Sequence, residues 1–267
     1  MLQSTTNRKS LLKLYKGGLY MAKKFIKQRL VIFLLLAAIG LTLVGCQSVD
    51  DSLSGQQEAL IKENVEEWFG GKKLEKYVGN NREYDWFIDQ GNTGEHSNSN
   101  CGPASVVMAM KWRDEDFEGT VEEAREKFLP NGGWWLTSTV AQYLDSYEVE
   151  YEYLMLDSND YEKATEDLKE IIEEEKIAIL CVSMGYITRE TEPELRVNRF
   201  YDYDDGHFLV VKGYAKVDGE TYFEVYDPNN WGVKYEDGTA AGKDRYYLAE
   251  ELIDSAINWH PFAIVIE

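Results

Sequence analysis

The chain has 267 residues, a net charge of −20 and an aromatic content of 13 %. That aromatic fraction indicates a packed core and excludes an intrinsically disordered polypeptide. The negative charge excludes nucleic-acid binding, because the protein and the phosphate backbone would repel each other.

The N-terminal segment predicts an export signal. An apolar run of 15 residues, Leu30 to Val44, follows a basic stretch and ends at Gly45-Cys46. A basic flank, a short apolar stretch and a small residue are the layout of a secretory signal peptide. The run is shorter than the ~20 residues that a transmembrane helix needs. The sequence LVGC resembles the lipobox of bacterial lipoproteins, and this resemblance implies lipid attachment at Cys46 and anchoring on the outer face of the cell membrane.

The start of this signal is unusually long. Met21 opens a typical basic segment, MAKKFIKQRL, and Lys16-Gly17-Gly18 can be encoded by a stretch that resembles a ribosome-binding site. We therefore expect translation to begin at Met21, so that residues 1–20 carry no structure.

The predicted organisation is a signal peptide over 1–45, a polar tether over 46–57 and one globular domain over 58–267. Residues 1–45 contain eight basic residues and no acidic one, so the remainder carries 20 basic against 48 acidic residues, a net charge of −28. Such a charge favours solubility and cationic partners.

Helical patterns dominate the first half of the domain. Apolar residues in 58–69 recur at helical spacing. Thr120 and Glu123 form a capping-box pair that predicts a helix toward Phe128. Further helices are predicted from about Thr137, with Val140, Tyr143 and Leu144 inward, and over 160–175, with Tyr161, Ala164, Leu168 and Ile172 inward.

Strand patterns dominate the second half. They cover Val149–Leu154, Ile177–Ser183, His207–Tyr214, Thr221–Tyr226, Arg245–Leu248 and Pro261–Ile266, with a helix near Ala249–Ile257. Helices first and strands later predict an α+β fold, in which a helical half packs on an antiparallel sheet.

Cys101 stands where a polar loop meets a helix. The segment SNSNCGPASVVMAMKW places Pro103 in the first helical turn, where its missing N–H costs nothing. The turns that follow are apolar on all sides, which predicts a buried helix. A thiol at such an N-terminus is stabilised as the thiolate, the form that attacks a carbonyl. A cysteine at a helix start can equally serve packing.

Three other residues complete a candidate constellation. His207 begins one strand and Asp227 follows the next, and a cysteine, a histidine and an orienting carboxylate are the parts of acyl-transfer catalysis. Gln90 could donate an N–H to an oxyanion. The alternatives are an ordinary strand-end histidine, and an aspartate that serves the turn before Pro228.

The remaining cysteine and the aromatic pair are less informative. Cys181 lies in the apolar run IAILCVS and is expected to be a buried packing thiol, although a disulfide with Cys101 is an alternative. Trp134 and Trp135 belong either to the core or to a cleft wall. His96 and His260 are treated as incidental, because no metal-ligand spacing surrounds them. Neither a metal nor another cofactor is expected.

The blocks DWFIDQ…NCGPAS, DGHFLVVKGY and YDPNN resemble the papain-like cysteine peptidases related to bacteriocin (double-glycine) leader peptidases, over roughly Asp85 to Glu267. This resemblance implies a papain-like fold and a peptide or protein substrate. It also implies Cys101 as nucleophile, His207 as general base, Asp227 as its orienting residue and Gln90 as the oxyanion-hole glutamine.

Two features depart from that pattern. The spacing between Gln90 and Cys101 is longer than usual in the family, so that GNTGEHSNSN forms an insertion beside the site. The chain also has no room for the transporter domains of leader-exporting machines, which disfavours leader processing in the cytoplasm.

The expected function is therefore that of an extracytoplasmic, lipid-anchored cysteine peptidase acting through a thioester. An amidase or acyltransferase acting on cell-wall peptides is the alternative among enzymes. A catalytically inactive binding lipoprotein of the same fold is the alternative among other classes.

The strand pair around Asp218-Gly219 makes a geometric prediction. A two-residue loop without irregularity would pair Val217 with Glu220 and place His207 and Asp227 on opposite faces of the sheet. We therefore predict a three-residue loop or a bulge, with Gly219 at positive φ.

Overall fold

The computed structural model describes residues 59–267, and the predicted signal peptide, Cys46 and the tether lie outside them. Residues 59–68 are helical, close to the predicted 58–69. The remaining elements are β1 (Leu74–Gly79), two 3-10 turns η1 (Gln90–Asn92) and η2 (Ser97–Ser99), α2 (Cys101–Arg113), α3 (Val121–Phe128), α4 (Thr137–Asp145), β2 (Tyr151–Met155), α5 (Tyr161–Glu173), β3 (Ile177–Ser183), a third 3-10 turn η3 (Met184–Tyr186), β4 (Gly206–Val217), β5 (Glu220–Tyr226), β6 (Arg245–Leu248), α6 (Ala249–Ile257) and β7 (Phe262–Ile266).

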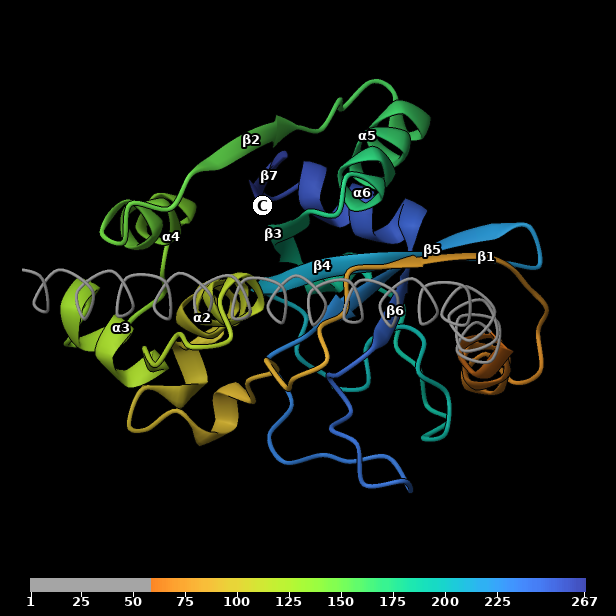
Figure 1. Ribbon diagram of the computed structural model, residues 1–267, viewed down its shortest axis with the longest axis horizontal. Coiled ribbons are helices and arrows are strands. Elements are labelled where there is room, and N and C mark those ends of the chain that lie inside the picture. The colour runs from red at the N-terminus through yellow and green to blue at the C-terminus, as the bar shows by residue number, and fades with distance from the viewer. Residues whose placement is uncertain (1–58) are drawn as a thin grey trace, which may run out of the picture. The chain divides into compact units, whose positions relative to one another are not determined.

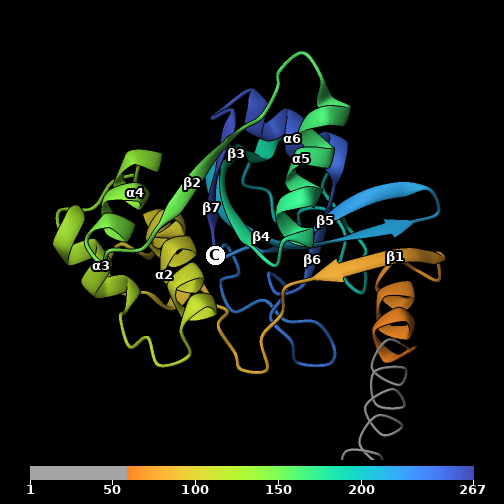
Figure 2. The same cartoon turned by 45° about the horizontal axis from the view of Figure 1, so that its top comes forward.

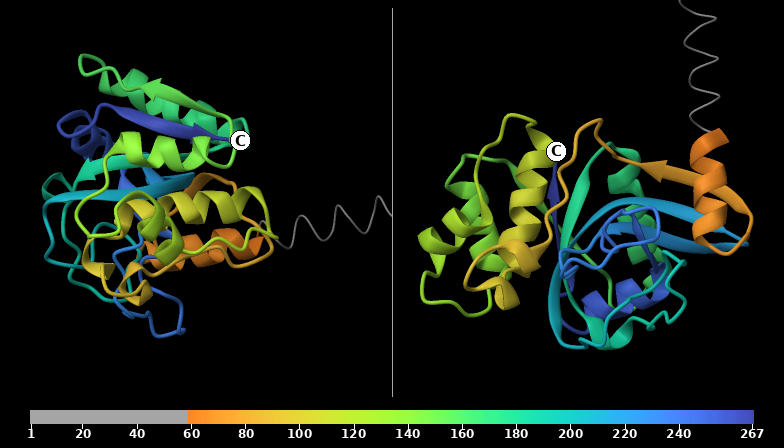
Figure 3. Two further views of the ribbon diagram at one scale, coloured as in Figure 1. Left: turned by 90° about the vertical axis from the view of Figure 1, so that its left-hand side faces the viewer. Right: turned by 90° about the horizontal axis from the view of Figure 1, so that it is seen from below.

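The predicted α+β architecture is confirmed. The strands form one seven-stranded sheet in the order β2-β7-β3-β4-β5-β6, with β1 added beside β4, and every named pair is antiparallel. Helices α2, α3 and α4 gather on one side of this sheet, and α5 and α6 cover the other side (Figures 1 to 3). In the described part of the chain, no helix combines the length and apolar character needed to cross a membrane.

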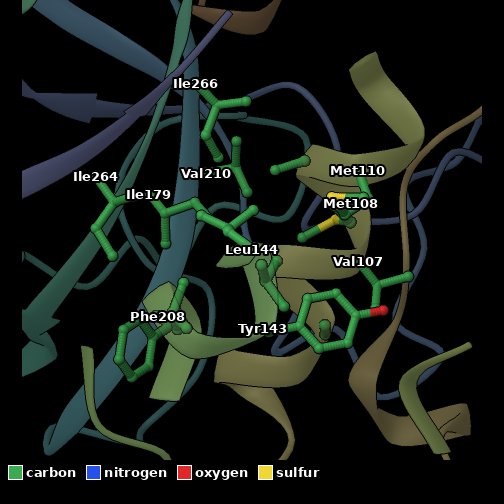
Figure 4. Close-up of a cluster of buried hydrophobic side chains, with 14 of the residues drawn as sticks. Val107, Met108, Met110, Tyr143, Leu144, Ile179, Phe208, Val210, Ile264 and Ile266 are labelled. Atoms are coloured by element: carbon green, nitrogen blue, oxygen red, sulfur yellow. The ribbon is translucent and has the colours of Figure 1, made fainter. Parts of the chain in front are cut away.

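Helix α2 is the centre of the first core layer. Its residues from Cys101 to Met110 are all buried, as the run of apolar residues predicts. Met108 packs in a cluster with Leu144 of α4 and with Ile179 and Val210 of the sheet (Figure 4). The nucleophile candidate therefore starts a helix that the core holds on all sides.

The second core layer lies under α5 and α6. Ala164, Leu168 and Ile172 of α5 are fully buried, as predicted. The prediction for Tyr161 is wrong, since this residue is 40 % exposed. Its hydroxyl lies at the surface and donates to Asp254 at 3.1 Å, which keeps the polar end of the ring in contact with a partner and water.

The prediction omitted strand β1. Its sequence, LEKYVG, has charged residues in the middle and no fully buried side chain. It pairs with the second half of β4, from Gly213 to Val217, while the first half of β4 pairs with β3. Edge strands of this kind take their conformation from the neighbouring strand and carry only a weak apolar pattern.

The β4–β5 hairpin meets the geometric requirement through a bulge. Val217 pairs with Glu220 across a two-residue turn, so of the two predicted alternatives the longer loop is not the one realised. Asp218 and Gly219 have φ values of 48° and 87°, as an Asp-Gly hairpin turn requires. The register then shifts between Val211 and Gly213, which confirms the predicted irregularity.

The shift changes which side chains share a face of the sheet. Beyond it Val211 pairs with Val225, so side chains spaced by two from these residues lie on the same face. His207 on β4 and Asp227 just after β5 therefore point to one side, as the catalytic interpretation needs.

Candidate active site

Cys101 is the first residue of α2 and is 4 % exposed. No side chain caps this helix start, so its free N–H groups remain directed at the thiol and its surroundings. The positive end of the helix dipole favours a negative sulfur there. Cys101 and Cys181 are both free thiols, so the alternative of a disulfide between them is not realised.

His207 bridges the thiol and a buried carboxylate. Its Nε2 lies 2.7 Å from Oδ1 of Asp227, and the two side chains are 2 % and 0 % exposed. Because Nε2 donates to the carboxylate, Nδ1 is the nitrogen that remains for Cys101. The sequence analysis expected Cys101, His207 and Asp227 at one site. In the structure Cys101 and His207 line one cavity, and Asp227 contacts His207.

The protonation states of His207 and Asp227 follow from burial and from their mutual contact. Burial by itself lowers the pKa of His207, but the Asp227 carboxylate and the hydrogen bond with Cys101 outweigh it and raise the pKa to about 10. Burial likewise acts to raise the pKa of Asp227, and the His207 charge overcomes this and lowers it. At neutral pH the pair is therefore an imidazolium and a carboxylate, which favours a thiolate at Cys101.

Two tyrosines and a backbone N–H complete the surroundings of Asp227. The hydroxyls of Tyr201 and Tyr247 donate to Oδ2 at 2.6 and 2.5 Å, and the N–H of Asn229 donates to Oδ1 at 2.9 Å. Burial and the charge of Asp227 raise the pKa of both tyrosines, so both hydroxyls remain donors. With His207 these bonds satisfy a fully buried charge.

The sequence did not point to these tyrosines. Tyr247 pairs with Phe223 on the neighbouring strand and so shares the face that leads to Asp227. Only a known strand register would have placed it there. Tyr201 lies in the long connection before β4, whose pattern carries no periodic signal.

Gln90 lies in the same cavity as Cys101 and His207. Its backbone N–H donates to the carbonyl of Pro228 at 2.9 Å and its Nε2 to that of Ser97 at 3.2 Å. Nε2 has a second N–H, which suits a developing oxyanion. The insertion before Cys101 does not push Gln90 away, because it folds into the compact turns η1 and η2.

Asp89 ties the glutamine segment to the loop after β5, and sequence reasoning missed it. Its carboxylate accepts the backbone N–H groups of Gly91 at 2.8 Å, Trp231 at 2.9 Å and Gly232 at 2.7 Å. It also accepts Nδ2 of Asn230 at 2.9 Å. Asp89 therefore fixes the segment of Gln90 relative to the loop that contains Trp231, and both of these residues line the cavity. Its position beside Gln90 in DWFIDQ was the one signal in the sequence.

Two cavities flank the thiol. The first has a volume of about 430 Å³ and is lined by Gln90, Asn98, Cys101, Trp134, Tyr201, Tyr203, His207, Asn229 and Trp231. The second has a volume of about 320 Å³ and is lined by Cys101, Trp134, Trp135, Leu136, Cys181, Tyr203, Asp205, Gly206, Phe208, Trp259 and His260.

The aromatic pair is divided between core and cleft. Trp134 is 55 % exposed and stacks on Tyr203, with ring centroids 6.5 Å apart, where the two cavities meet. Trp135 is buried against Phe128 and contributes to the lining of the second cavity. Cys181 lines that second cavity, and burial raises its pKa, so it is a neutral thiol as expected of a packing residue.

Comparison with known proteins gives a family. No curated protein matches the sequence of this chain. A solved structure described as a C39-like peptidase from Bacillus anthracis has 14 % identity and a TM-score of 0.46, covering 72 % of this chain and 98 % of that one. UfSP from C. elegans has 16 % identity and a TM-score of 0.45, covering 72 % and 34 %.

A digestive procathepsin L 3 from the larval midgut of Tenebrio molitor has 16 % identity and a TM-score of 0.37, covering 66 % of this chain and 69 % of that one. Residues 86–252, more than half of the chain, match the Peptidase_C39 like family. The chain therefore belongs to the Peptidase_C39 like family.

Proposed function

We propose that this protein is a lipid-anchored extracytoplasmic cysteine peptidase whose nucleophile is Cys101. The observation that carries the proposal is the buried imidazole of His207, which is bonded to Asp227 at 2.7 Å and lines the same open cavity as Cys101. A charged histidine beside a thiol at a helix N-terminus is the arrangement that generates a nucleophilic thiolate.

The reaction would run in two steps. The Cys101 thiolate attacks the carbonyl carbon, and the oxyanion lies near the N–H groups at the start of α2 and the amide of Gln90. His207 gives its Nδ1 proton to the leaving amine, and a thioester with Cys101 remains. Water then attacks this thioester while His207 accepts its proton, so that the acid leaves and the Cys101 thiolate and His207 imidazolium are restored.

The two cavities favour a peptide over a small amide. Because both cavities are lined by Cys101, Trp134 and Tyr203, an extended chain bound at the thiol can place side chains in both. Aromatic walls suit apolar groups of such a chain. An amidase or acyltransferase acting on cell-wall peptides would use the same residues and becomes the conclusion if no linear peptide is cleaved.

Labelling with an epoxysuccinyl thiol probe separates an enzyme from an inactive binding protein. We expect the probe on Cys101, loss of label in Cys101→Ala and full labelling of the matched variant Cys181→Ala. A digest of a peptide library by the same preparations then defines the substrate. An unlabelled Cys101 in folded protein, with no peptide cleaved, contradicts the proposal.

The anchoring part rests on the LVGC sequence that ends at Cys46. In the bacterial host we expect the protein in the membrane fraction, with a diacylglyceryl group on Cys46 detected by mass spectrometry. Cys46→Ala should abolish lipidation, whereas Cys181→Ala should not. An unlipidated wild-type protein in the soluble fraction would show that the anchor assignment is wrong.

A further inference from the structure

Helix α3 places a buried positive charge behind the nucleophile. Arg125 is 4 % exposed, although it belongs to a short helix whose other charged residues are at the surface. The capping box of Thr120 and Glu123 fixes the start of that helix, and α3 lies beside α2 (Figure 2). The buried face of α3 therefore presents Arg125 to the segment that leads into Cys101.

The guanidinium of Arg125 binds the two residues that immediately precede Cys101. Its Nε donates to Oδ1 of Asn100 at 2.7 Å and its Nη2 to the carbonyl of Ser99 at 2.6 Å. Its Nη1 donates to the carbonyl of Gly133 at 2.8 Å, next to the cleft-wall residue Trp134. One side chain thus joins the turn before the nucleophile to the wall of the cavity.

These bonds satisfy donors but leave the charge without a counter-ion. Within residues 59–267 no carboxylate forms an ion pair with Arg125, whereas the equally buried Arg196 pairs with Asp237 at 2.6 Å. A buried guanidinium without a carboxylate is costly, and proteins keep such a charge where another anion compensates it. Burial lowers the pKa of Arg125, and the proximity of Cys101 acts in the opposite direction.

The other groups that face Cys101 do not provide this compensation. His207 on β4 is itself cationic, and Cys181 on β3 is a neutral thiol. Further titratable groups come from the connection before β4 and from the segment before β7: Tyr201, Tyr203, Asp205 and His260. Asp205 is a carboxylate, but it is exposed and forms no ion pair with Arg125. Of the charged groups around the thiol, Arg125 is the one bonded to the residues next to it.

We propose that Arg125 is a positioning residue for Cys101, which fixes the Ser99–Asn100 turn and supplies a buried positive charge that stabilises the thiolate. The proposal rests on the proposed function, because it takes Cys101 as the nucleophile. The hydrogen-bond donors of Arg125 fix the geometry of the Ser99–Asn100 turn, and its positive charge favours the thiolate form of Cys101.

The test measures how fast iodoacetamide alkylates Cys101 as a function of pH in the full-length protein in detergent, with each cysteine followed by mass spectrometry. In Arg125→Met we expect the midpoint of this profile to move up by about one pH unit, the effect of losing one nearby opposite charge. In Arg125→Lys we expect the midpoint to stay near wild type while kcat falls, because the charge remains and the fork is lost.

A second buried arginine provides the matched control. Arg245 donates to the carbonyls of Leu195 at 2.9 Å and Val197 at 2.6 Å, and it binds no residue adjacent to Cys101. Arg245→Met should lower stability without moving the alkylation midpoint. An equal shift in Arg245→Met, or no shift in Arg125→Met, overturns the inference.

The outcomes also separate this inference from the proposed function. If wild-type Cys101 reacts no faster than free cysteine at pH 6, the proposed function fails. If it reacts fast and Arg125→Met reacts identically, only the role of Arg125 fails. Should Arg125→Met not fold, Arg125→Lys decides, because an unchanged midpoint with a lower kcat supports the proposal and a raised midpoint refutes it.

Discussion

The β4–β5 hairpin carries two buried ionic clusters, and they differ in how many of their hydrogen-bonding groups are paired within the cluster. In the first, His207 binds Asp227 through Nε2 and lines a cavity together with Cys101. In the second, Lys212 binds Glu224 at 2.7 Å and Asp244 at 2.8 Å. Both central side chains are almost inaccessible, with 2 % and 0 % exposure.

The Lys212 cluster has no reactive position to offer. Its ammonium donates its three hydrogens to Glu224, Asp244 and Oδ1 of Asn81, the last at 2.6 Å. Tyr77 donates to the second oxygen of Glu224 at 2.8 Å, which leaves that carboxylate paired as well. Burial of charge alone therefore does not mark a candidate active site. The His207 pair differs because it lines a cavity together with a thiol at a helix start.

The two clusters are nevertheless linked by geometry. Lys212 is the residue left over where the register of the hairpin shifts between Val211 and Gly213. Its ion pairs hold the extra residue in the interior, and the shift places His207 on the face of Asp227. The Lys212 cluster stabilises the register shift in β4, and the contact between His207 and Asp227 depends on that shift.

Removing the imidazole should have the largest effect on the first cluster. His207→Gln is expected to lower kcat by about 10⁴-fold or more, because proton transfer to the leaving amine is lost. Circular dichroism should still report a folded chain. Turnover within tenfold of wild type, measured with a peptide substrate, would show that His207 is a structural residue.

The next largest effect is expected for the residue that orients the imidazole. Asp227→Asn should reduce kcat by about 10²–10⁴-fold, because the amide cannot hold the charged imidazolium or its donor nitrogen in the same way. KM should change much less, since Asp227 is fully buried. The control is Asp204→Asn, which changes an exposed aspartate that lines neither cavity, and an equal loss there would contradict a specific role for Asp227.

The second cluster should respond in stability instead of chemistry. Lys212→Met leaves Glu224 and Asp244 facing each other without a cation, and we expect a loss of about 3–5 kcal/mol in the free energy of unfolding. Urea unfolding measures this loss, and kcat per folded molecule should fall far less than in His207→Gln, because Lys212 acts only through the register of the strand. A triple variant with Glu224→Gln and Asp244→Asn should recover part of the lost stability. Loss of catalysis at unchanged stability would reverse the assignment.

The smallest expected effect is a difference in pH dependence. The pKa of His207 is raised to about 10 in the folded state, so its stabilising contribution is complete below the unfolded value near 6.5 and is lost as pH rises through 10. The stability advantage of wild type over His207→Gln should thus fall by about 1 kcal/mol per unit between pH 7 and 10.

The matched measurement uses Lys212→Met. The pKa of Lys212 is raised by Asp244 and Glu224 against the opposing effect of burial, so Lys212 keeps its proton in both states up to about pH 9. Its contribution should stay level where that of His207 declines. Parallel slopes for the two variants in thermal unfolding would remove the distinction between the clusters.

Local sequence patterns were enough to predict the elements whose apolar residues recur with the period of a helix or a strand. β3, β6 and α6 lie at the predicted residues, and the capping box of Thr120 starts α3 as predicted. The residues Cys101, His207 and Asp227 were also found this way, because a thiol at a helix start and polar residues at strand ends are visible in short segments. Their catalytic roles remain proposals.

The amino-acid sequence by itself thus determined the α+β order, the buried nucleophile helix and the identity of the polar residues around it, since these depend on neighbours within a few positions. Tertiary structure decided the edge strand β1, the bulge at Lys212 and the bonds of Asp89, Arg125 and Tyr247. Each of these depends on groups distant in the chain, because a buried charge or an unpaired strand edge is satisfied by whatever the fold brings beside it.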